Sequence, residues 1–462
     1  MTTELWKVYT VEKHNRLNYS KVEYILFLFV GICISLAVSD SSGIQNLPII
    51  DRLLVYAKFI WLAYLPVALI TSYGILRYNP REDILLERRK QNGNYKVIFQ
   101  IVTRGFNREA VKRSVRSILY WASMYLKDYE VWVVTEDDVD REFFDGLKTI
   151  DNLNRVKVIY VPKEYITPRK TKYKARALQY ALELRRKIGY ISNRIWIYLM
   201  DEESIVGEDT VLGIIDFIES GKSLIGQGLI VYSNFWGANR LTSLEDSLRS
   251  ADDITRYKLQ AKFGKVFVGV HGSHLLYRSD LEDKIGWDFG KVRAEDAIFG
   301  LYVNERFGNV WGWLKGKLYE QSPFSIRDFL IQRRRWLWGK LDIIFKDDKI
   351  GKLSKFILIV HLISWLSSLP SVILTYVNVI HPTPIPHPAT SIAFGFCIST
   401  LVYLYWEGFK LNTEPIGKDR SVYRILNILL IPIIAPLEGI AAWYGLITYR
   451  RSQIAGFEVI KK

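Results

Sequence analysis

Cysteine, methionine and histidine are scarce in this chain of 462 residues, which contains two, three and six of them respectively. Cys33 and Cys397 both lie inside apolar runs. A disulfide framework or a cysteine-based metal site is therefore not expected, and the fold should not depend on an oxidising compartment. A cleavable signal peptide is not expected either, because the first apolar run, which begins near Tyr24, is followed at once by a second one.

Positive charge is in excess, with a formal net charge of +15. A basic chain suits nucleic acid, an anionic membrane surface or phosphate-bearing small molecules. The long apolar runs favour the last two, so membrane lipid is an expected partner and nucleic acid is not.

Five apolar runs divide the chain, at residues 24–38, 53–76, 356–380, 392–405 and 425–447. A bilayer core needs about 20 helical residues, so the second run is long enough to span it, while the first is shorter. The last run contains Pro432, Pro436 and Glu438, which indicates a broken or re-entrant element. A plain fifth span is the alternative, and the sequence leaves both open.

Lysine and arginine indicate the orientation. They flank the first two runs at Lys7, Lys13, Arg16, Lys21, Arg77, Arg81, Arg88, Arg89 and Lys90, whereas the loop at residues 39–48 has none. The positive-inside rule then places the N-terminus and the middle of the chain in the cytoplasm. We expect an integral protein of the plasma membrane or an endomembrane.

Four segments are predicted. Residues 1–77 carry two transmembrane helices, 78–323 form a cytoplasmic catalytic domain, and 353–462 hold two spans, the Pro-broken third and a short tail. Residues 324–352 form an interfacial amphipathic helix, on which the side chains expected on or near the lipid side are Phe329, Leu330, Trp336, Ile343 and Ile344.

Strand-like and helix-like stretches alternate in the catalytic segment. Apolar strands are predicted at residues 95–102, 131–135, 156–161 and 195–200, with helices at 108–125 and 174–186. This alternation is typical of an α/β fold with a doubly wound parallel sheet, whose ligands bind at the carboxyl ends of the strands.

Polar and acidic residues follow three of these strands. Thr103 and Arg104 follow the first, Glu136 and Asp137 end the second, and the sequence Asp201-Glu202-Glu203 ends the fourth. Asp201 and Glu203 are suited to hold Mg²⁺ or Mn²⁺, which takes one or two carboxylates and fills its shell with water and substrate phosphate. Taken alone, two acids separated by one residue are weak evidence for a metal site, and polar residues also follow ordinary strands.

A second acidic pair, Glu295 and Asp296, opens a helix-like stretch. Acids at a helix start can simply stabilise the helix dipole. The functional interpretation is a general base, because sugar transfer with inversion needs a carboxylate to take the proton of the acceptor hydroxyl.

Three further motifs are candidate binding elements. Gln332, Arg335 and Trp336 belong to a basic-aromatic motif, in which Arg335 suits a diphosphate and Trp336 an acceptor. Lys174 and Arg176 open a helix and suit an anion, although exposed charge explains them equally well. His271 is followed by Gly272, where a tight turn would expose backbone N–H groups to a ligand.

The order of these motifs resembles that of the membrane-bound family 2 glycosyltransferases of the cellulose-synthase-like type, and more closely the egghead-type β-1,4-mannosyltransferases. The resemblance rests on residues 103–105, 174–180, 225–228, 294–296, 322–324 and 332–336, and covers about residues 95 to 339 and the tail at 457–461.

The resemblance implies a Rossmann-like GT-A fold, a divalent cation, and inverting transfer of mannose from GDP-mannose to a lipid-linked sugar or glycolipid. It implies Asp296 as the base, Asp201 and Glu203 at the metal, and nucleotide-sugar contacts from Thr103, Arg104, Lys174, Arg176, Asp201 and Glu202. It also implies that Glu136 or Asp137 contacts the nucleotide base or ribose. It further implies contacts to the diphosphate and the acceptor from Gln332, Arg335, Trp336, Glu295, His271 and Gly272. Glu136 and Glu203 stand where the family usually has aspartate, which lengthens both arms.

Two rival functions are weighed against this one. A processive polysaccharide synthase using a UDP-sugar would need enough helices to enclose a polymer, and four or five short spans are few. A non-enzymatic receptor or scaffold would leave the ordered acids and the Gln332–Trp336 motif without a role.

Overall fold

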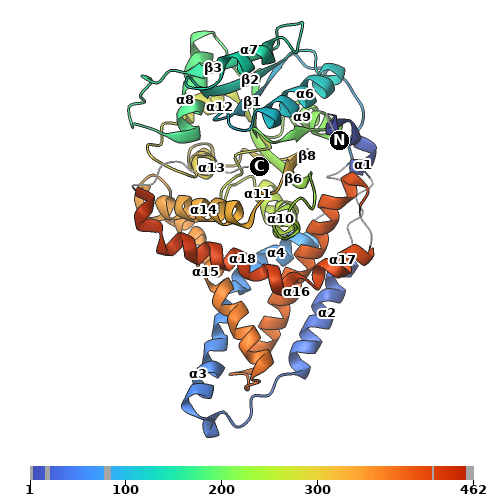
Figure 1. The fold of residues 1–462 in the computed structure, drawn as a ribbon, viewed down its shortest axis with the longest axis vertical. Coiled ribbons are helices and arrows are strands. Elements are labelled where there is room, and N and C mark those ends of the chain that lie inside the picture. The colour runs from blue at the N-terminus through green and yellow to red at the C-terminus, as the bar shows by residue number, and fades with distance from the viewer. Residues whose placement is uncertain (1–3, 16–20, 78–84, 419–420, 454–462) are drawn as a thin grey trace.

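The computed structural model describes residues 4–15, 21–77, 85–418 and 421–453. Arg16, Arg81, the predicted boundary at residue 78 and the tail at 457–461 lie outside these residues. A sheet domain occupies one end of the elongated molecule and a bundle of helices the other (Figure 1).

The sheet domain is built on one eight-stranded mixed sheet, in the order β3-β2-β1-β4-β7-β6-β8-β5. The four strands β3, β2, β1 and β4 are parallel, and β7 runs antiparallel to both β4 and β6. The strands are β1 (Lys96–Val102), β2 (Tyr129–Glu136), β3 (Val156–Val161), β4 (Ile195–Asp201), β5 (Ile205–Val206), β6 (Ile225–Asn234), β7 (Leu275–Arg278) and β8 (Trp311–Gln321). The α/β prediction is confirmed, but the predicted parallel sheet is mixed, because β7 pairs antiparallel with β4 and β6, and β5 with β8.

All four predicted strands and both predicted helices are present, with ends that move by at most two residues. The strands are continuous apolar runs because helices cover both faces of the sheet. One face packs against α6 (Arg108–Tyr125), α7 (Arg141–Lys148) and α9 (Glu208–Ser220). The other packs against α8 (Tyr173–Lys187), α12 (Ser279–Ile285) and α13 (Glu295–Phe307).

The bundle consists of α2 (Lys21–Ala37), the continuous helical segment α3–η3–α4 (Ile49–Ala57, Lys58–Tyr64, Leu65–Arg77), α15 (Lys352–Ile380) and α16 (Pro388–Thr413). By length and composition, three helices among the described residues are able to cross a membrane: Ile49–Arg77, Lys352–Ile380 and Pro388–Ile416. Helix α2 has 17 residues and packs along α16, where Ser35 Oγ donates to Ser391 O at 2.7 Å. The first apolar run thus forms a shorter helix beside a longer one.

The residues that precede α2 pack against the sheet domain. The short elements η1 (Leu5–Val8) and α1 (Val11–Asn15) lie on either side of Tyr9, whose ring stacks on that of Tyr319 with centroids 3.5 Å apart. Val11 N also donates to Glu208 Oε2 at 2.9 Å. The chain therefore leaves the sheet domain through α2 and comes back to it through α4 (Figure 1).

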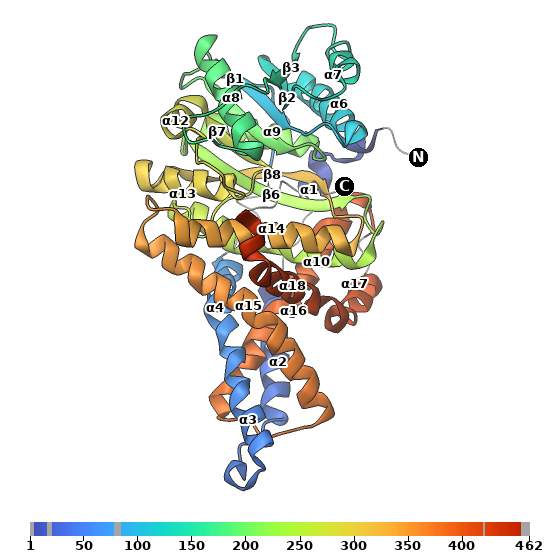
Figure 2. The same cartoon turned by 60° about the vertical axis from the view of Figure 1, so that its left-hand side comes forward.

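Three helices lie crosswise between the domain and the bundle: α14 (Ile326–Lys346), α17 (Ser421–Ile428) and α18 (Ile431–Ile447) (Figures 1 and 2). Helices α17 and α18 are bent by 53° where they meet, which makes them a broken span or a re-entrant loop. The predicted break is present, but it precedes Pro432 and Pro436.

The prediction that Phe329, Ile343 and Ile344 of α14 lie on the lipid side is wrong, whereas Leu330 and Trp336 are partly exposed. Phe329 and Ile343 are 0% exposed, and Ile344 is 8% exposed. The physical reason is that α14 is covered on both sides, by the sheet domain and by α15 and α18, so its apolar residues join the core. The remaining elements are η2 (Ile44–Asn46), α10 (Arg240–Asp252), η4 (Asp253–Tyr257), α11 (Lys258–Phe263), η5 (Glu414–Ile416) and η6 (Tyr449–Gln453).

Candidate active site

One cavity of about 1020 Å³ connects the carboxyl ends of the strands with the helical bundle. Its wall at the sheet edge includes Thr103, Asp201 and Asp296, and its wall in the bundle includes Trp61, Ser371 and Phe394. We call these two parts the sheet end and the bundle end. All but two of the predicted site residues line it; the exceptions are Asp137 and Arg176.

The three acids after β4 have different surroundings. Asp201 Oδ1 accepts from Lys174 Nζ at 2.5 Å. Glu202 is bound by the Thr103 hydroxyl and by Asn107 Nδ2, the latter at 2.5 Å. Burial and the neighbouring Glu203 raise the pKa of Glu202 to about 7. Glu202 thus joins the β1–α6 loop to the strand end.

Glu295 and Asp296 stand at the start of α13, opposite Lys174. Burial raises the pKa of Asp296, and Lys174 opposes this shift. Burial and Asp296 together raise the pKa of Glu295 to about 7. A carboxylate whose pKa moves toward neutrality is a stronger base than an ordinary aspartate, so Asp296 is suited to accept a proton.

Gly272 allows these charges to come together. Lys174 Nζ donates to the Gly272 carbonyl at 2.8 Å. A β-carbon at Gly272 would stand 3.0 Å from Asp296 Oδ2 and 3.1 Å from Lys174 Nζ, tighter than most side chains allow. The neighbouring His271 is held by Asp253, with Nε2 and Oδ1 2.7 Å apart. Gly272 therefore acts by leaving room for the Lys174 ammonium.

Glu136 is the acid of β2 that reaches the cavity. It forms ion pairs with Arg176 and, at 3.4 Å, with Arg104. Asp137 instead pairs with Arg141 at the start of α7. Between the two candidates that the sequence left open, the geometry favours Glu136, and Arg176 orients it from outside the cavity.

The motif on α14 brings Arg335 into the sheet end. Its guanidinium is buried close to Asp201, Glu203, Glu295 and Asp296; burial lowers the pKa of Arg335, and these carboxylates oppose the shift. The Trp336 ring lies 4.3 Å from the guanidinium carbon of Arg249 and 4.3 Å from that of Arg333. Trp336 thus forms a wall of the cavity.

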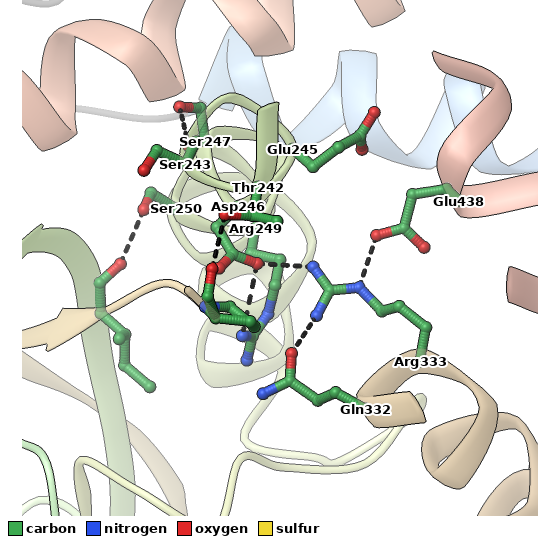
Figure 3. A network of polar contacts seen from close by, with 12 residues as sticks. Thr242, Ser243, Glu245, Asp246, Ser247, Arg249, Ser250, Gln332, Arg333 and Glu438 are labelled. Carbon is green, nitrogen blue, oxygen red and sulfur yellow. Dashed lines mark hydrogen bonds and ion pairs between the residues drawn. The ribbon is translucent and has the colours of Figure 1, made fainter. Parts of the chain in front are cut away.

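Arg333 holds the motif in place through partners that the sequence did not reveal (Figure 3). Its Nη2 donates to Asp246 Oδ1 at 2.5 Å, its Nε to Glu438 Oε1 at 2.6 Å, and its Nη1 to Gln332 Oε1 at 2.6 Å. Glu438 carried one signal, since an acid inside an apolar run is expensive unless it has a function. Asp246 and Asn107 carried none, because their roles depend on partners from distant helices or loops.

The donor set fits a divalent cation. No group of three or more His, Cys, Asp or Glu side chains in the described part of the chain is placed to hold a metal ion. Mg²⁺ and Mn²⁺ do not need one, because one or two carboxylates suffice when substrate phosphate completes the shell. Asp201 already holds a cation, the Lys174 ammonium, at this position.

Comparison with known proteins gives two kinds of likeness. The family described as Glycosyl transferase family group 2 matches residues 196–406. The β-1,4-mannosyltransferase egh of Drosophila melanogaster is 31% identical over 402 residues, which cover 86% of this chain and 85% of that relative. The β-1,4-mannosyltransferase bre-3 of Caenorhabditis briggsae is 32% identical over 315 residues, or 67% of this chain and 66% of that relative.

Among solved structures, the fold is similar to that of the mannosyltransferase PcManGT from Pyrobaculum calidifontis, in complex with GDP-Man and Mn²⁺. The TM-score is 0.50 over 86% of this chain and 98% of that one. The sequence identity is 13%, so this likeness concerns the fold alone. It confirms the predicted GT-A fold.

Proposed function

The chain belongs to the family 2 glycosyltransferases, among the egghead and bre-3 type β-1,4-mannosyltransferases, and from this membership we propose that it transfers mannose from GDP-mannose to a lipid-linked sugar or glycolipid in β linkage. It is a hexosyltransferase of the mannosyltransferase type. The observation that carries the proposal is the single cavity that joins the carboxylates of the sheet edge to the helices of the bundle.

The donor binds at the sheet end. Asp201 and Glu203 would hold a divalent cation, Mg²⁺ or Mn²⁺, and such an ion would supply positive charge to neutralise the diphosphate. Arg335 and Lys174 face the same space and stabilise the negative charge that grows on the leaving diphosphate. Glu136 and Arg104 lie on the nucleotide side, at the ends of the neighbouring strands.

Asp296 accepts the proton of the acceptor hydroxyl. The hydroxyl oxygen forms a bond to C1 of mannose from the face opposite the diphosphate, and the bond between C1 and the diphosphate oxygen breaks. The electron pair leaves with GDP, and the α-linked mannose of the donor becomes β-linked in the product. The walls contributed by Trp336 and His271 position the acceptor sugar.

The acceptor approaches from a membrane. The N-terminal segment and the sheet domain pack together, and the chain between them passes through the bundle and returns. With the positive-inside rule this supports a cytoplasmic sheet domain at the plasma membrane or an endomembrane. Tyr449 OH donates to Asp342 Oδ1 on α14 at 2.9 Å, which supports the same side for η6 and a re-entrant α17–α18 pair. A processive synthase is less favoured, because at most four spans are found among the described residues.

The test is an Asp296→Asn variant assayed with radiolabelled GDP-mannose and lipid acceptors. We expect transfer to fall by about 10²–10⁴-fold while GDP still binds, because only the proton acceptor is lost. Asp348→Asn, which changes an exposed acid in the turn before α15, is the matched control and should transfer normally. Chelation by EDTA should also stop transfer. A wild-type transfer rate in Asp296→Asn would refute the assignment of Asp296 as the base. Preference for a UDP-sugar would refute GDP-mannose as the donor.

A further inference from the structure

The bundle end of the cavity carries a cluster of basic groups that the chemistry at the sheet end does not use. Lys340 of α14, Arg256 of η4 and His361 of α15 all line it. Lys340 Nζ lies 3.0 Å from His361 Nδ1 and 4.8 Å from the centre of the Trp365 ring. An ionisable side chain such as His361, inside a helix able to span a membrane, is a candidate functional group.

Carboxylates near Lys340 are engaged elsewhere. Glu438 accepts from Arg333 through Oε1 and from Trp365 Nε1 through Oε2, the latter at 3.2 Å. Asp252 is held by both Arg256 Nε and Arg256 Nη2. Lys340 forms no ion pair with a carboxylate in the described part of the chain. Burial and the nearby Arg256 lower its pKa to about 7, which a bound anion would reverse.

The cluster offers donors that point to an anion. When Lys340 is protonated, its ammonium donates to Nδ1 of His361, and this places the ring proton on Nε2, where it can be donated to a ligand. Ser364 lies one helical turn further along α15 and lines the same cavity. It is 4% exposed, and its hydroxyl has no hydrogen-bond partner among the residues that the structure describes. Two N–H groups and a hydroxyl suit the oxygens of a phosphate.

Beyond this cluster the cavity continues between the helices of the bundle. Its wall on α15 runs from His361 to Thr375, which is about 21 Å at the helical rise per residue. The lining there is apolar or weakly polar, with Ser367, Ser371, Val372, Phe394, Ile398 and Leu401. This length and chemistry suit a lipid chain better than a second sugar.

We propose that the bundle end binds the phosphate of a lipid phosphate or diphosphate through Lys340, His361 and Ser364, with the lipid chain along α15. The proposal rests on the proposed function, because it names the class of acceptor for the same cavity: a sugar carried on a lipid phosphate and not on a neutral lipid. Arg256 adds positive charge nearby without leaving its pair with Asp252.

The experiment measures binding of geranylgeranyl phosphate to the full chain in detergent, by its effect on tryptophan fluorescence. Geranylgeraniol, its uncharged alcohol, and inorganic phosphate are the comparison probes. We expect the lipid phosphate to bind at least about 10-fold more tightly than either, since a charge-assisted hydrogen bond is worth about 10- to 100-fold in affinity. Lys340→Gln should remove most of this preference. Lys352→Gln, which changes an exposed lysine at the start of α15, should keep it.

Equal binding of the phosphate and the alcohol by the wild type would overturn the proposal, as would an equal loss in Lys340→Gln and Lys352→Gln. The proposal would also be overturned if inorganic phosphate bound as tightly as the lipid phosphate, because the lipid chain would then contribute nothing to the affinity. The outcome is separate from that of the proposed function. Mannose transfer from GDP-mannose to a neutral glycolipid, without lipid-phosphate binding, would refute this site alone.

Discussion

The two ends of the cavity differ in the charge that they bury. At the sheet end, Asp201, Glu203, Glu295 and Asp296 surround Lys174 and Arg335, so acids outnumber the cations among them. At the bundle end, Lys340 stands beside His361 with no carboxylate partner in the described residues. An excess of carboxylates suits the binding of a divalent cation and the transfer of a proton. An excess of basic side chains suits the binding of an anion that does not react. Substitutions at the two ends should therefore have separable effects.

Arg333 stands between the two ends, and its removal should have the largest effect. It is 1% exposed and joins Asp246 of α10 to Glu438 of α18. Arg333→Ala leaves the buried carboxylate of Asp246 and the partly buried carboxylate of Glu438 without this guanidinium, which costs about 3–5 kcal/mol in the free energy of unfolding. Thermal unfolding of the protein in detergent measures it. Arg327→Ala, at the exposed start of the same helix, should have the melting temperature of the wild type. Equal melting temperatures of the two variants would show that Arg333 does not stabilise the contact between α10 and α18.

Arg335→Lys tests whether the sheet end acts on every acceptor alike. The charge among the carboxylates is kept, but the planar fork that matches a diphosphate is lost. We expect the rate of mannose transfer to fall by about 10²-fold, the usual effect of losing one transition-state donor. The fall should be the same for a lipid-phosphate acceptor and a neutral glycolipid. If the transfer rate falls with only one of the two acceptors, Arg335 contacts the acceptor and not the diphosphate of the donor.

Glu202→Gln should have the smallest effect, and only on the pH dependence of stability. The pKa of Glu202 is raised from 4.5 to about 7, so the folded state binds more protons than the unfolded state between these values. Stability is then highest below about pH 4.5 and falls as pH rises through 7. Melting temperatures across this range should fall less in Glu202→Gln than in the wild type. Equal slopes would show that the pKa of Glu202 is the same in the folded and the unfolded protein.

The sheet half of the molecule could be predicted well because its signals are local. Each parallel strand is a continuous apolar run with polar residues at its carboxyl end, and that rule alone brings Thr103, Glu136 and Asp201 to one edge. The pairing of Glu202 with Asn107 was not predictable, since it depends on how one loop folds over another.

The crosswise helices were harder to predict, for a physical reason. Helix α14 carries arginines and aromatic residues that fit both a membrane surface and a buried polar joint. Hydropathy does not distinguish the two, because Arg333 is neutralised by Asp246, 87 positions earlier in the chain, and by Glu438, 105 positions later. Tertiary partners thus decided the side on which Phe329 and Trp336 lie.

The most direct measurement is the mass of the product formed by the purified protein from GDP-mannose, a divalent cation and a lipid-linked sugar. We predict that the acceptor gains a single hexose, in β linkage, and that Asp296→Asn forms none of this product. A ladder of hexose additions from one acceptor, or transfer to free sugars as fast as to lipid-linked ones, would contradict a cavity that holds a lipid at one end and performs one transfer at the other.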